Sequence, residues 1–262
     1  MKKGDAVLAG QLIAEADGFV SANIVSSCSG TVKAIEERHT ISGGRAACIV
    51  IANDGLFNSA PGIGVDRDAS AFSGPQILDA IKWAGIVGLG GAGFPTHVKL
   101  APRNPEQIDY VIANGSECEP YITCDDQLMR TQSSGIVEGM RLVLRLFPNA
   151  RGVIAIEDNK PEAIEAMTHA CEGDANLSVL PVMAKYPEGG ERSLIGVVTG
   201  RQLRFGQLPA DLGCVVCNVS TLNAIYRAVC KTEPLMGRLF TVSGDAVANP
   251  HTLFVRIGTF LQ

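Results

Sequence analysis

The sequence predicts an α/β fold with a parallel sheet, preceded by a small all-β domain and followed by a short β-rich segment. Two observations support this prediction. Between residues 74 and 233, short apolar runs of strand length alternate with longer runs of helical apolar spacing, a pattern typical of a parallel sheet covered by helices. On both sides of this part, short alternating runs are separated by glycines, which indicates small antiparallel sheets.

The composition indicates a globular protein of the cytosol. With 262 residues, of which 46% are hydrophobic, the chain is long enough for one or two domains. The net charge is −5 and there is no basic run, so we expect no nucleic-acid partner. No stretch approaches the roughly 18 consecutive apolar residues of a membrane helix. Acidic residues within positions 5–17 interrupt the apolar core that a signal peptide needs.

Residues 1–58 are predicted to form the all-β domain, because glycines at positions 4, 10, 18 and 30 separate short alternating runs. This part resembles the barrel-sandwich hybrid domain of biotinyl and lipoyl carriers. Such a carrier needs a lysine at its hairpin tip, and the expected tip, residues 16–19, has none. We therefore expect a structural or docking role, followed by a linker over residues 59–73 that is rich in small and polar residues.

The stretch 85–99, GIVGLGGAGFPTHVK, holds five glycines within nine residues. Glycine has no side chain to pack, so these positions serve backbone geometry. Exposed N–H groups in such a loop bind anions, usually phosphate, and Lys99 follows within reach. The alternative for this stretch alone is a surface turn without a ligand.

The context of this loop excludes two common phosphate motifs. Glycines 88, 90 and 93 fit G-x-G-x-x-G, but a dinucleotide fold needs a strand before them. Here a helix is predicted over 75–84, with Ser73 as its N-cap and Gly85 at its end. A P-loop is excluded because no G-K-[ST] closes the loop.

A second polar segment follows a predicted strand over 108–113. Asn114 and Gly115 are expected to end this strand as a turn. Ser116 and Glu117 come directly after, at the end of the strand where ligands bind in α/β domains. A carboxylate there can accept hydrogen bonds from ribose or ribityl hydroxyls, and an asparagine amide can pair with ring carbonyl and imide groups.

The rest of the α/β pattern gives the remaining elements. We expect strands over 151–157, 178–184 and 215–218, and helices over 125–131, 135–147, 161–170 and 192–198. Asn159 is the expected N-cap of the helix over 161–170, and Ser220 or Thr221 that of a last helix running to Cys230.

A third polar segment, YPEGGE at 186–191, joins a strand to a helix. An aromatic residue, two glycines and an acid suit a planar ring with a second ligand stacked on it. The alternative is a tight turn in which Tyr186 is a half-buried surface aromatic.

The eight cysteines are expected to be reduced, because they are scattered over a long chain without a secretory signal. Cys214 and Cys217 form one C-x-x-C in an apolar run, and no second pair completes a zinc or iron–sulfur site. We interpret these two as residues of a buried strand. Four others are interpreted as small core residues: Cys28, Cys48, Cys171 and Cys230.

Four motifs in this order, GLGGAGFPTHVKL, NGSECEPYITCDD, YPEGGERSLIGVVTG and VVCNVSTLNAI, resemble RnfC, a component of the Rnf ion-translocating electron-transport complex. That family is similar to the flavoprotein of respiratory complex I, which oxidises NADH with a bound FMN. The resemblance implies a Rossmann-like FMN- and NADH-binding domain over 74–233 and the start of a β-grasp domain over 234–262. It also implies that 4Fe-4S clusters belong to a part of the full-length protein absent here.

The resemblance further implies a cofactor site. The residues expected at the FMN phosphate are Gly88, Gly90, Gly91, Gly93 and Lys99. Asn114, Glu117 and Asn218 are expected to hydrogen-bond the flavin or its ribityl chain, and Asn218 and Thr221 to lie near the phosphate and ribityl chain. Tyr186, Gly189, Gly190 and Glu191 are expected to line the flavin and nicotinamide region. Phe94 is expected either to stack on the nucleotide or to belong to the core. We expect no catalytic side chain, because the flavin carries the chemistry. We expect no metal ligand, because the four histidines lie far apart in the sequence.

The sequence departs from the complex I pattern in the same segments. Ser116 and Cys118 replace Asp and Ser, Tyr-Ile-Thr follows Pro120, and Gly190 stands where an acidic residue would assist the nucleotide. These differences bear on NADH more than on the FMN phosphate.

The resemblance therefore implies an NADH-oxidising, FMN-binding protein that passes electrons reversibly to iron–sulfur clusters outside this chain. Its partners would be the other subunits of an Rnf-type membrane complex, and it would lie on the cytoplasmic, inner face of the cell membrane. The alternative is a non-catalytic scaffold that keeps the fold and docks cluster-bearing partners without flavin.

Overall fold

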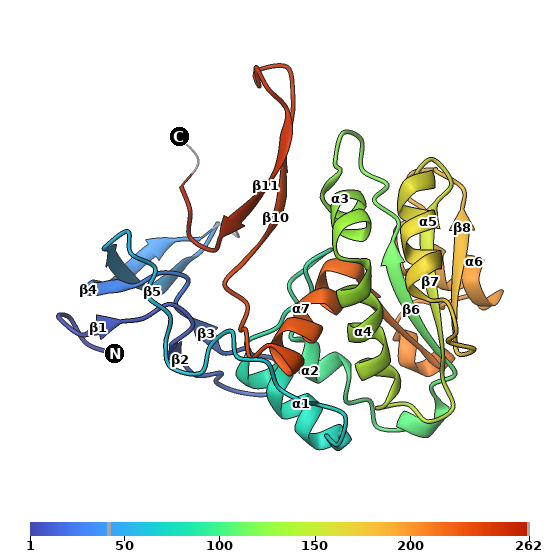
Figure 1. The fold of residues 1–262 in the computed structure, drawn as a ribbon, viewed down its shortest axis with the longest axis horizontal. Helices are drawn as coiled ribbons and strands as arrows, with labels where there is room; N and C mark the ends of the chain where they lie inside the picture. Colours follow the sequence, from blue (N-terminus) through green and yellow to red (C-terminus); the bar gives the residue numbers. More distant parts are fainter. Residues whose placement is uncertain (41–42, 261–262) are drawn as a thin grey trace.

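A computed structural model describes residues 1–40 and 43–260. An α/β domain forms one side of the molecule and a group of β-strands the other, with a long hairpin rising between them (Figure 1). The hairpin contacts both sides. Ser27 Oγ donates to the Ile257 carbonyl, and the Thr123 N–H donates to Thr241 Oγ1. Within residues 1–40 and 43–260, no helix is long and apolar enough to cross a membrane.

The α/β domain is built on a four-stranded parallel sheet. Its strands are β6 (Tyr110–Gly115), β7 (Arg151–Glu157), β8 (Leu177–Val182) and β9 (Cys214–Asn218), in the order β8-β7-β6-β9. The chain moves outward from β6 to β8 and then returns to the other side of β6. This order confirms the predicted parallel α/β fold and creates a switch point between β6 and β9, where open α/β sheets bind their ligands.

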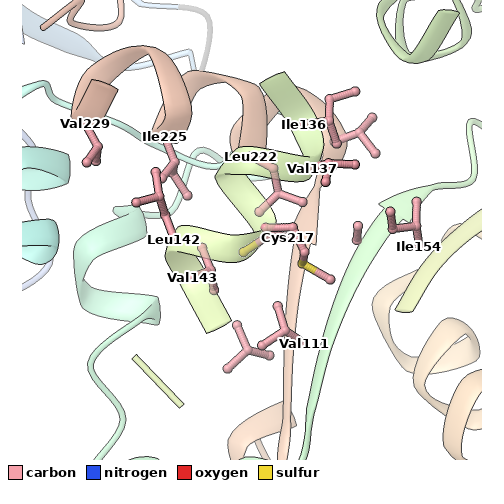
Figure 2. Close-up of a cluster of buried hydrophobic side chains, with 14 of the residues drawn as sticks. Val111, Ile136, Val137, Leu142, Val143, Ile154, Cys217, Leu222, Ile225 and Val229 are labelled. Carbon is pink, nitrogen blue, oxygen red and sulfur yellow. The ribbon is translucent and has the colours of Figure 1, made fainter. Parts of the chain in front are cut away.

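Helices cover both faces of this sheet. They are α3 (Cys124–Thr131), α4 (Ser133–Leu144), α5 (Pro161–Ala170), α6 (Glu191–Thr199) and α7 (Val219–Cys230). Alternate side chains point to opposite faces of a strand. Val111 and Cys217 accordingly meet helices α4 and α7 in the larger core (Figure 2), whereas Ile112 and Val216 pack with Leu194 of α6.

Helix α1 (Gly74–Trp83) precedes the glycine-rich stretch, as predicted. Ser73 is its N-cap, with its N–H donating to Gln76 Oε1 at 2.8 Å. Gly85 follows the helix with a φ of +65°, and a Cβ there would lie 2.4 Å from the Asn23 carbonyl oxygen. Three short elements complete the domain: α2 (Thr96–Lys99) and the 3₁₀ turns η1 (Pro105–Gln107) and η2 (Pro209–Leu212).

The N-terminal part consists of strands β1 (Ala6–Val7), β2 (Leu12–Ala14), β3 (Ile24–Val25), β4 (Gly30–His39) and β5 (Arg45–Asn53). Strands β1, β4 and β5 form an antiparallel sheet, and β2 pairs with β3. The expected tip at 16–19 lies between β2 and β3, where Phe19 is 80% exposed. We call strands β1 to β5 the N-terminal β region.

At the other end, β10 (Gly237–Val242) and β11 (His251–Arg256) form the antiparallel hairpin. The β-grasp assignment stays a prediction, and its last residues, 261–262, lie outside the described part.

Several predicted boundaries and caps were wrong. Asn114 and Gly115 belong to β6 rather than to a turn, because both pair with β7 and Asn114 also pairs with Asn218 of β9. Sheet neighbours on both sides thus override the turn preference of Asn-Gly. Helix α4 ends at Leu144 rather than at 147, and β8 ends at Val182 rather than at 184.

Two N-caps also differ from the prediction. Lys160, not Asn159, is the N-cap of α5. Asn218, not Ser220 or Thr221, is that of α7, since its Oδ1 accepts from the Ser220 N–H at 2.9 Å.

The cysteine predictions are confirmed in part. Cys214 and Cys217 are buried in β9, and Cys171 is buried behind α5. Cys230 is half-buried but packs against the larger core, whereas Cys28 and Cys48 are half-buried and belong to neither core, so the assignment of these two is wrong. Cys48 lies on β5, in a sheet too small to bury both of its faces.

Candidate functional site

The switch point brings together two asparagines that the sequence singled out. Asn114 ends the segment of β6 that pairs with β9, and Asn218 is its partner in the register. Asn218 Nδ2 lies 3.5 Å from the Asn114 carbonyl oxygen. The carboxyl ends of β6 and β9 therefore present two amide side chains at the edge of the sheet where a ligand is expected.

The glycine-rich stretch folds into a narrow loop at this edge. A bridge between Val87 and Pro95 closes its base, and the Gly88 N–H donates to the Phe94 carbonyl at 2.9 Å. At the tip, the Leu89 N–H donates to Thr221 Oγ1 at 3.0 Å. A Cβ on Gly90 would lie 2.7 Å from Asn218 Nδ2, so only glycine lets the loop approach α7 this closely.

The N-terminus of α7 lies directly against this loop. Asn218 caps the helix and satisfies one of its first N–H groups, that of Ser220. The N–H groups of the first turn lie at the positive end of the dipole of this twelve-residue helix. The loop and the helix end thus form a surface suited to phosphate. Gly91 and Gly93 are exposed at its rim.

Two acidic residues link this region to α3, Glu117 from the loop after β6 and Asp125 from the first turn of α3. Glu117 is buried and caps α3, accepting from the Asp125 N–H at 3.0 Å and the Asp126 N–H at 3.2 Å. Asp125 then accepts from Asn218 Nδ2 and from Ser220 Oγ, both at 2.6 Å. Glu117, predicted to contact the flavin ring or the ribityl chain, is therefore directed toward α3 in this structure.

Asp125 is the residue that the sequence interpretation missed. The pattern indicates only that a helix begins there, although Asp125 follows the polar segment 114–119 on the same loop. The signal available was its place at the start of a helix that begins at the carboxyl edge of the sheet. Its two side-chain partners come from α7, at separations of 93 and 95 residues, which no local pattern reveals.

The segment 186–191 closes the other side of the edge. Asn114 Nδ2 donates to the Gly189 carbonyl at 2.8 Å. A Cβ on Gly189 would lie 2.4 Å from the Ser116 carbonyl oxygen, so this position also requires glycine. Gly190 is the N-cap of α6, and Glu191 is its first residue.

Lys99 reaches this side rather than the tip of the glycine loop. Its Nζ donates to the Val216 carbonyl of the edge strand β9 at 3.1 Å and lies 3.4 Å from Glu191 Oε1. The two side chains are 35% and 41% exposed, so this ion pair contributes little to stability.

Two aromatic side chains lie on the segments that flank this edge, Phe94 on the glycine loop and Tyr186 at the start of 186–191. Phe94 is 41% exposed and Tyr186 is 67% exposed. The core alternative for Phe94 is therefore wrong, and Tyr186 is more exposed than the half-buried aromatic of the turn alternative. Both rings are open to a planar ligand.

Buried polar atoms near Asn114 and Gly189 have no partner. Within residues 1–40 and 43–260, Ser116 Oγ and Glu188 Oε1 are buried without a hydrogen bond. Such groups cost free energy unless a ligand or water satisfies them. A flavin, with ring carbonyls, ring N–H and ribityl hydroxyls, would supply partners to both, so the residues present fit that group.

Several carboxyl groups lie close together beneath this edge of the sheet. Burial raises the pKa of Asp125 and that of Glu157, which ends β7. The negative charge of Glu117 raises both further. Burial and the hydrogen bond to Glu117 raise the pKa of the Cys124 thiol to about 12.

The chain matches known families in two segments. Residues 81–227 match the Nuo51 FMN-binding domain, and residues 1–56 match the RnfC barrel sandwich hybrid domain. The first match covers the switch point, the glycine loop and the 186–191 segment.

Similar proteins agree with these matches. The C component of the Na(+)-translocating ferredoxin:NAD(+) oxidoreductase complex of Acetobacterium woodii is 44% identical over 262 residues, which are 100% of this chain and 59% of that protein. The C component of the proton-translocating ferredoxin:NAD(+) oxidoreductase complex of Clostridium ljungdahlii is 46% identical over 99% of this chain and 56% of that protein. The chain therefore spans less than two thirds of these relatives.

A solved structure shares the fold of the α/β part. A chain of an NAD+-reducing [NiFe]-hydrogenase is 26% identical, with a TM-score of 0.60, over 71% of this chain and 37% of that one. The chain thus belongs to the Nuo51 FMN-binding domain family, in the RnfC form, which begins with a barrel sandwich hybrid domain.

Proposed function

We propose that this chain is the FMN- and NADH-binding subunit of an ion-translocating electron-transport complex. The observation that carries the proposal is the switch point, where the glycine loop meets the N-terminus of α7 beside polar atoms that lack partners within the described residues. Membership of the Nuo51 FMN-binding domain family supports it, as do the names of the relatives, which contain ferredoxin and NAD(+).

In this proposal the glycine loop and α7 hold the FMN phosphate. The N–H groups of Gly90, Gly91 and Gly93 and those of the first turn of α7 would donate to it, and Thr221 Oγ1 would donate to it while accepting from the Leu89 N–H. Lys99 would add positive charge at the phosphate after its ammonium leaves Glu191. The ion pair with Glu191 is partly exposed and therefore weak, so breaking it costs little free energy.

The ring and its partner nucleotide would lie toward 186–191. Asn114, Ser116 and Glu188 would hydrogen-bond the ring and ribityl chain, with Gly189 admitting the ring closely. Phe94 and Tyr186, both exposed, would orient NADH together with Glu191, and Gly190 would leave room for it. Bound flavin supplies hydride exchange with NADH and single-electron transfer. The contribution of the protein is therefore positioning, which needs no nucleophile.

The proposal includes partners and a place in the cell. The electrons would pass to iron–sulfur clusters outside this chain, and the reverse flow, toward NAD+, is the one in the relatives' names. The chain would lie at the inner face of the cell membrane, bound to the other subunits of an Rnf-type complex.

One observation favours the alternative of a scaffold without flavin. Lys99 and Glu117, two groups expected to touch FMN, have partners within the chain. A scaffold would keep these contacts and bind no cofactor.

An anaerobic absorbance titration of the chain with FMN, followed by NADH, separates the two. We expect the flavin spectrum to shift on binding and to bleach with NADH. Lys99→Ala should weaken FMN binding about tenfold, through the loss of one charge-assisted contact. The matched control is Lys33→Ala, at an exposed position on β4, which should bind as the parent does. A folded chain that leaves the flavin spectrum unchanged would support the scaffold and overturn the proposal.

A further inference from the structure

The carboxylate of Asp125 joins α3 to the first turn of α7. Its Oδ2 accepts from Asn218 Nδ2, and its Oδ1 accepts from Ser220 Oγ, both at 2.6 Å. Because the amide nitrogen of Asn218 faces Asp125, its Oδ1 faces the Ser220 N–H, which it caps at 2.9 Å. Asp125 thus fixes which way the Asn218 amide points.

The same amide is the contact on which the glycine loop rests. A Cβ on Gly90 would lie 2.7 Å from Asn218 Nδ2, so the loop and α7 meet at that nitrogen. We propose that Asp125 is the positioning residue that sets this junction for the phosphate of the cofactor, and that it takes up a proton from solvent when the dianionic phosphate binds. The inference rests on the proposed function and deepens it.

The charges around Asp125 explain why its carboxylate would take up a proton when the phosphate binds. Burial raises the pKa of its carboxyl group, and the neighbouring charge of Glu117 raises it further, while hydrogen bonds from Ser220 and Asn218 and the charge of Arg238 on β10 lower it. The Cys124 thiol beside it stays neutral, because its pKa is raised to about 12. A phosphate at the end of α7 adds negative charge nearby and raises the pKa of Asp125 again. The bound state therefore holds more protons, and binding tightens as the pH falls toward that pKa.

Isothermal titration calorimetry of the full chain with FMN tests both halves of the proposal. Done in two buffers of different ionisation enthalpy at pH 6 and pH 8, it measures the FMN affinity and the number of protons taken up on binding. Asp125→Asn preserves the shape and can accept from Asn218 while donating to Ser220, but it cannot take up the proton. Asp125→Ala loses both contacts. The matched control is Asp126→Asn, one residue along the same helix, where the carboxylate lies 3.5 Å from Arg130. The second ionisation of the FMN phosphate, near pH 6, also contributes to proton uptake, and the difference between the parent and Asp125→Asn gives the uptake that requires the Asp125 carboxylate.

We expect Asp125→Ala to weaken FMN binding about tenfold or more, since it removes two hydrogen bonds to a charged group. Asp125→Asn should stay within about threefold of the parent, because its contacts persist. Proton uptake of the parent should exceed that of Asp125→Asn, and by more at pH 6 than at pH 8. Asp126→Asn should match the parent in both.

Four results would overturn the inference. Unchanged affinity in Asp125→Ala would contradict the positioning role. Equal proton uptake in the parent and Asp125→Asn would contradict the uptake of a proton by Asp125. If Asp125→Ala does not fold, Asp125→Asn still decides, because a loss of affinity as large as tenfold would contradict positioning by shape. A parent chain that binds no FMN would overturn the proposed function itself, and this inference with it.

Discussion

The α/β domain and the N-terminal β region differ in how much apolar surface they bury. The sheet of the α/β domain has an apolar core on each face, and the larger one extends through α4, α5 and α7. The N-terminal β region, as far as it is described, buries four apolar side chains, those of Val7, Ala9, Val25 and Val32. A hydrogen bond from Ser29 Oγ to Asp54 Oδ1 at 2.7 Å links the start of β4 to the end of β5 in this region.

The difference explains where the candidate site lies. Buried carboxylates and unpartnered polar atoms reduce stability, and only a large surrounding core offsets that cost. The edge with Glu117, Glu157 and Ser116 belongs to the part of the chain with two cores. The described residues of the N-terminal β region form no comparable core.

Thiol reactivity is expected to show the difference most strongly. Burial raises the pKa of Cys217 to about 11, and the pKa of Cys124 is about 12. At pH 8, Cys124 should react with iodoacetamide about 10³-fold more slowly than free cysteine, because the thiolate is the nucleophile. Cys28 and Cys48, half-buried in the N-terminal β region, should react first.

Mass spectrometry of peptides taken during the reaction measures these rates, with the chain in urea as the control in which all sites react. Equal rates for Cys124 and Cys48 in the folded chain would contradict a closed interior for the α/β domain.

A pair of core substitutions tests the comparison directly. Ile154 of β7 is fully buried, and Ile154→Ala should lower the free energy of unfolding by about 4 kcal/mol. Val32 of β4 is 1% exposed, and Val32→Ala should cost about 2 kcal/mol, since it removes fewer carbons from a smaller core. Urea unfolding followed by fluorescence of the single tryptophan, Trp83 on α1, and by far-UV circular dichroism measures both.

Because Trp83 reports the α/β domain, Val32→Ala should shift the fluorescence transition less than Ile154→Ala does. A fluorescence shift in Val32→Ala as large as the shift of the same variant in circular dichroism would show that the two parts unfold as one unit and would break the comparison.

The smallest effect concerns an ion pair at the opposite edge of the sheet. The hydrogen bond from Arg201 holds the pKa of Asp109 below its usual value. Because the pKa is lowered in the folded state, the stabilisation is present above the ordinary pKa of about 3.9 and is lost as the pH falls through the lowered value. Both side chains are more than a third exposed, so Asp109→Asn should cost less than about 1 kcal/mol at pH 7.

Thermal unfolding from pH 2 to pH 7 measures this difference, with Arg201→Gln and the double variant completing a mutant cycle. A difference that persists at pH 2 would show that the pair acts through packing rather than charge.

The elements whose ends carry local signals were predictable from the sequence. The strand Arg151–Glu157 and the helix Pro161–Ala170 have the predicted bounds, because a continuous apolar run defines the first and a proline begins the second. Gly200 ends α6 in the left-handed conformation, as a glycine after a helix predicts. The glycine loop was likewise visible, because nothing but geometry accounts for so many glycines.

Features that depend on distant partners were not predictable. Asn114 and Gly115 form strand because β7 and β9 pair with this segment, and neither neighbour can be read from the local sequence. The contact of Lys99 with Val216 has the same origin, since it requires β9 to be the edge strand. The cofactor assignments of the site residues stay predictions.

The strand order also has a consequence for how the protein is made. Strand β6 finds β7 soon after it leaves the ribosome, but its other neighbour, β9, is synthesised much later, and Asn114 and Asn218 are 104 residues apart. Closing so long a segment is entropically costly and slows folding. One edge of β6 therefore stays unpaired during most of the synthesis of the domain, when it is open to aggregation or to chaperones. The glycine loop gains its contact with α7 only at the end of this process, so the capacity to bind a cofactor is among the last properties that the nascent chain acquires.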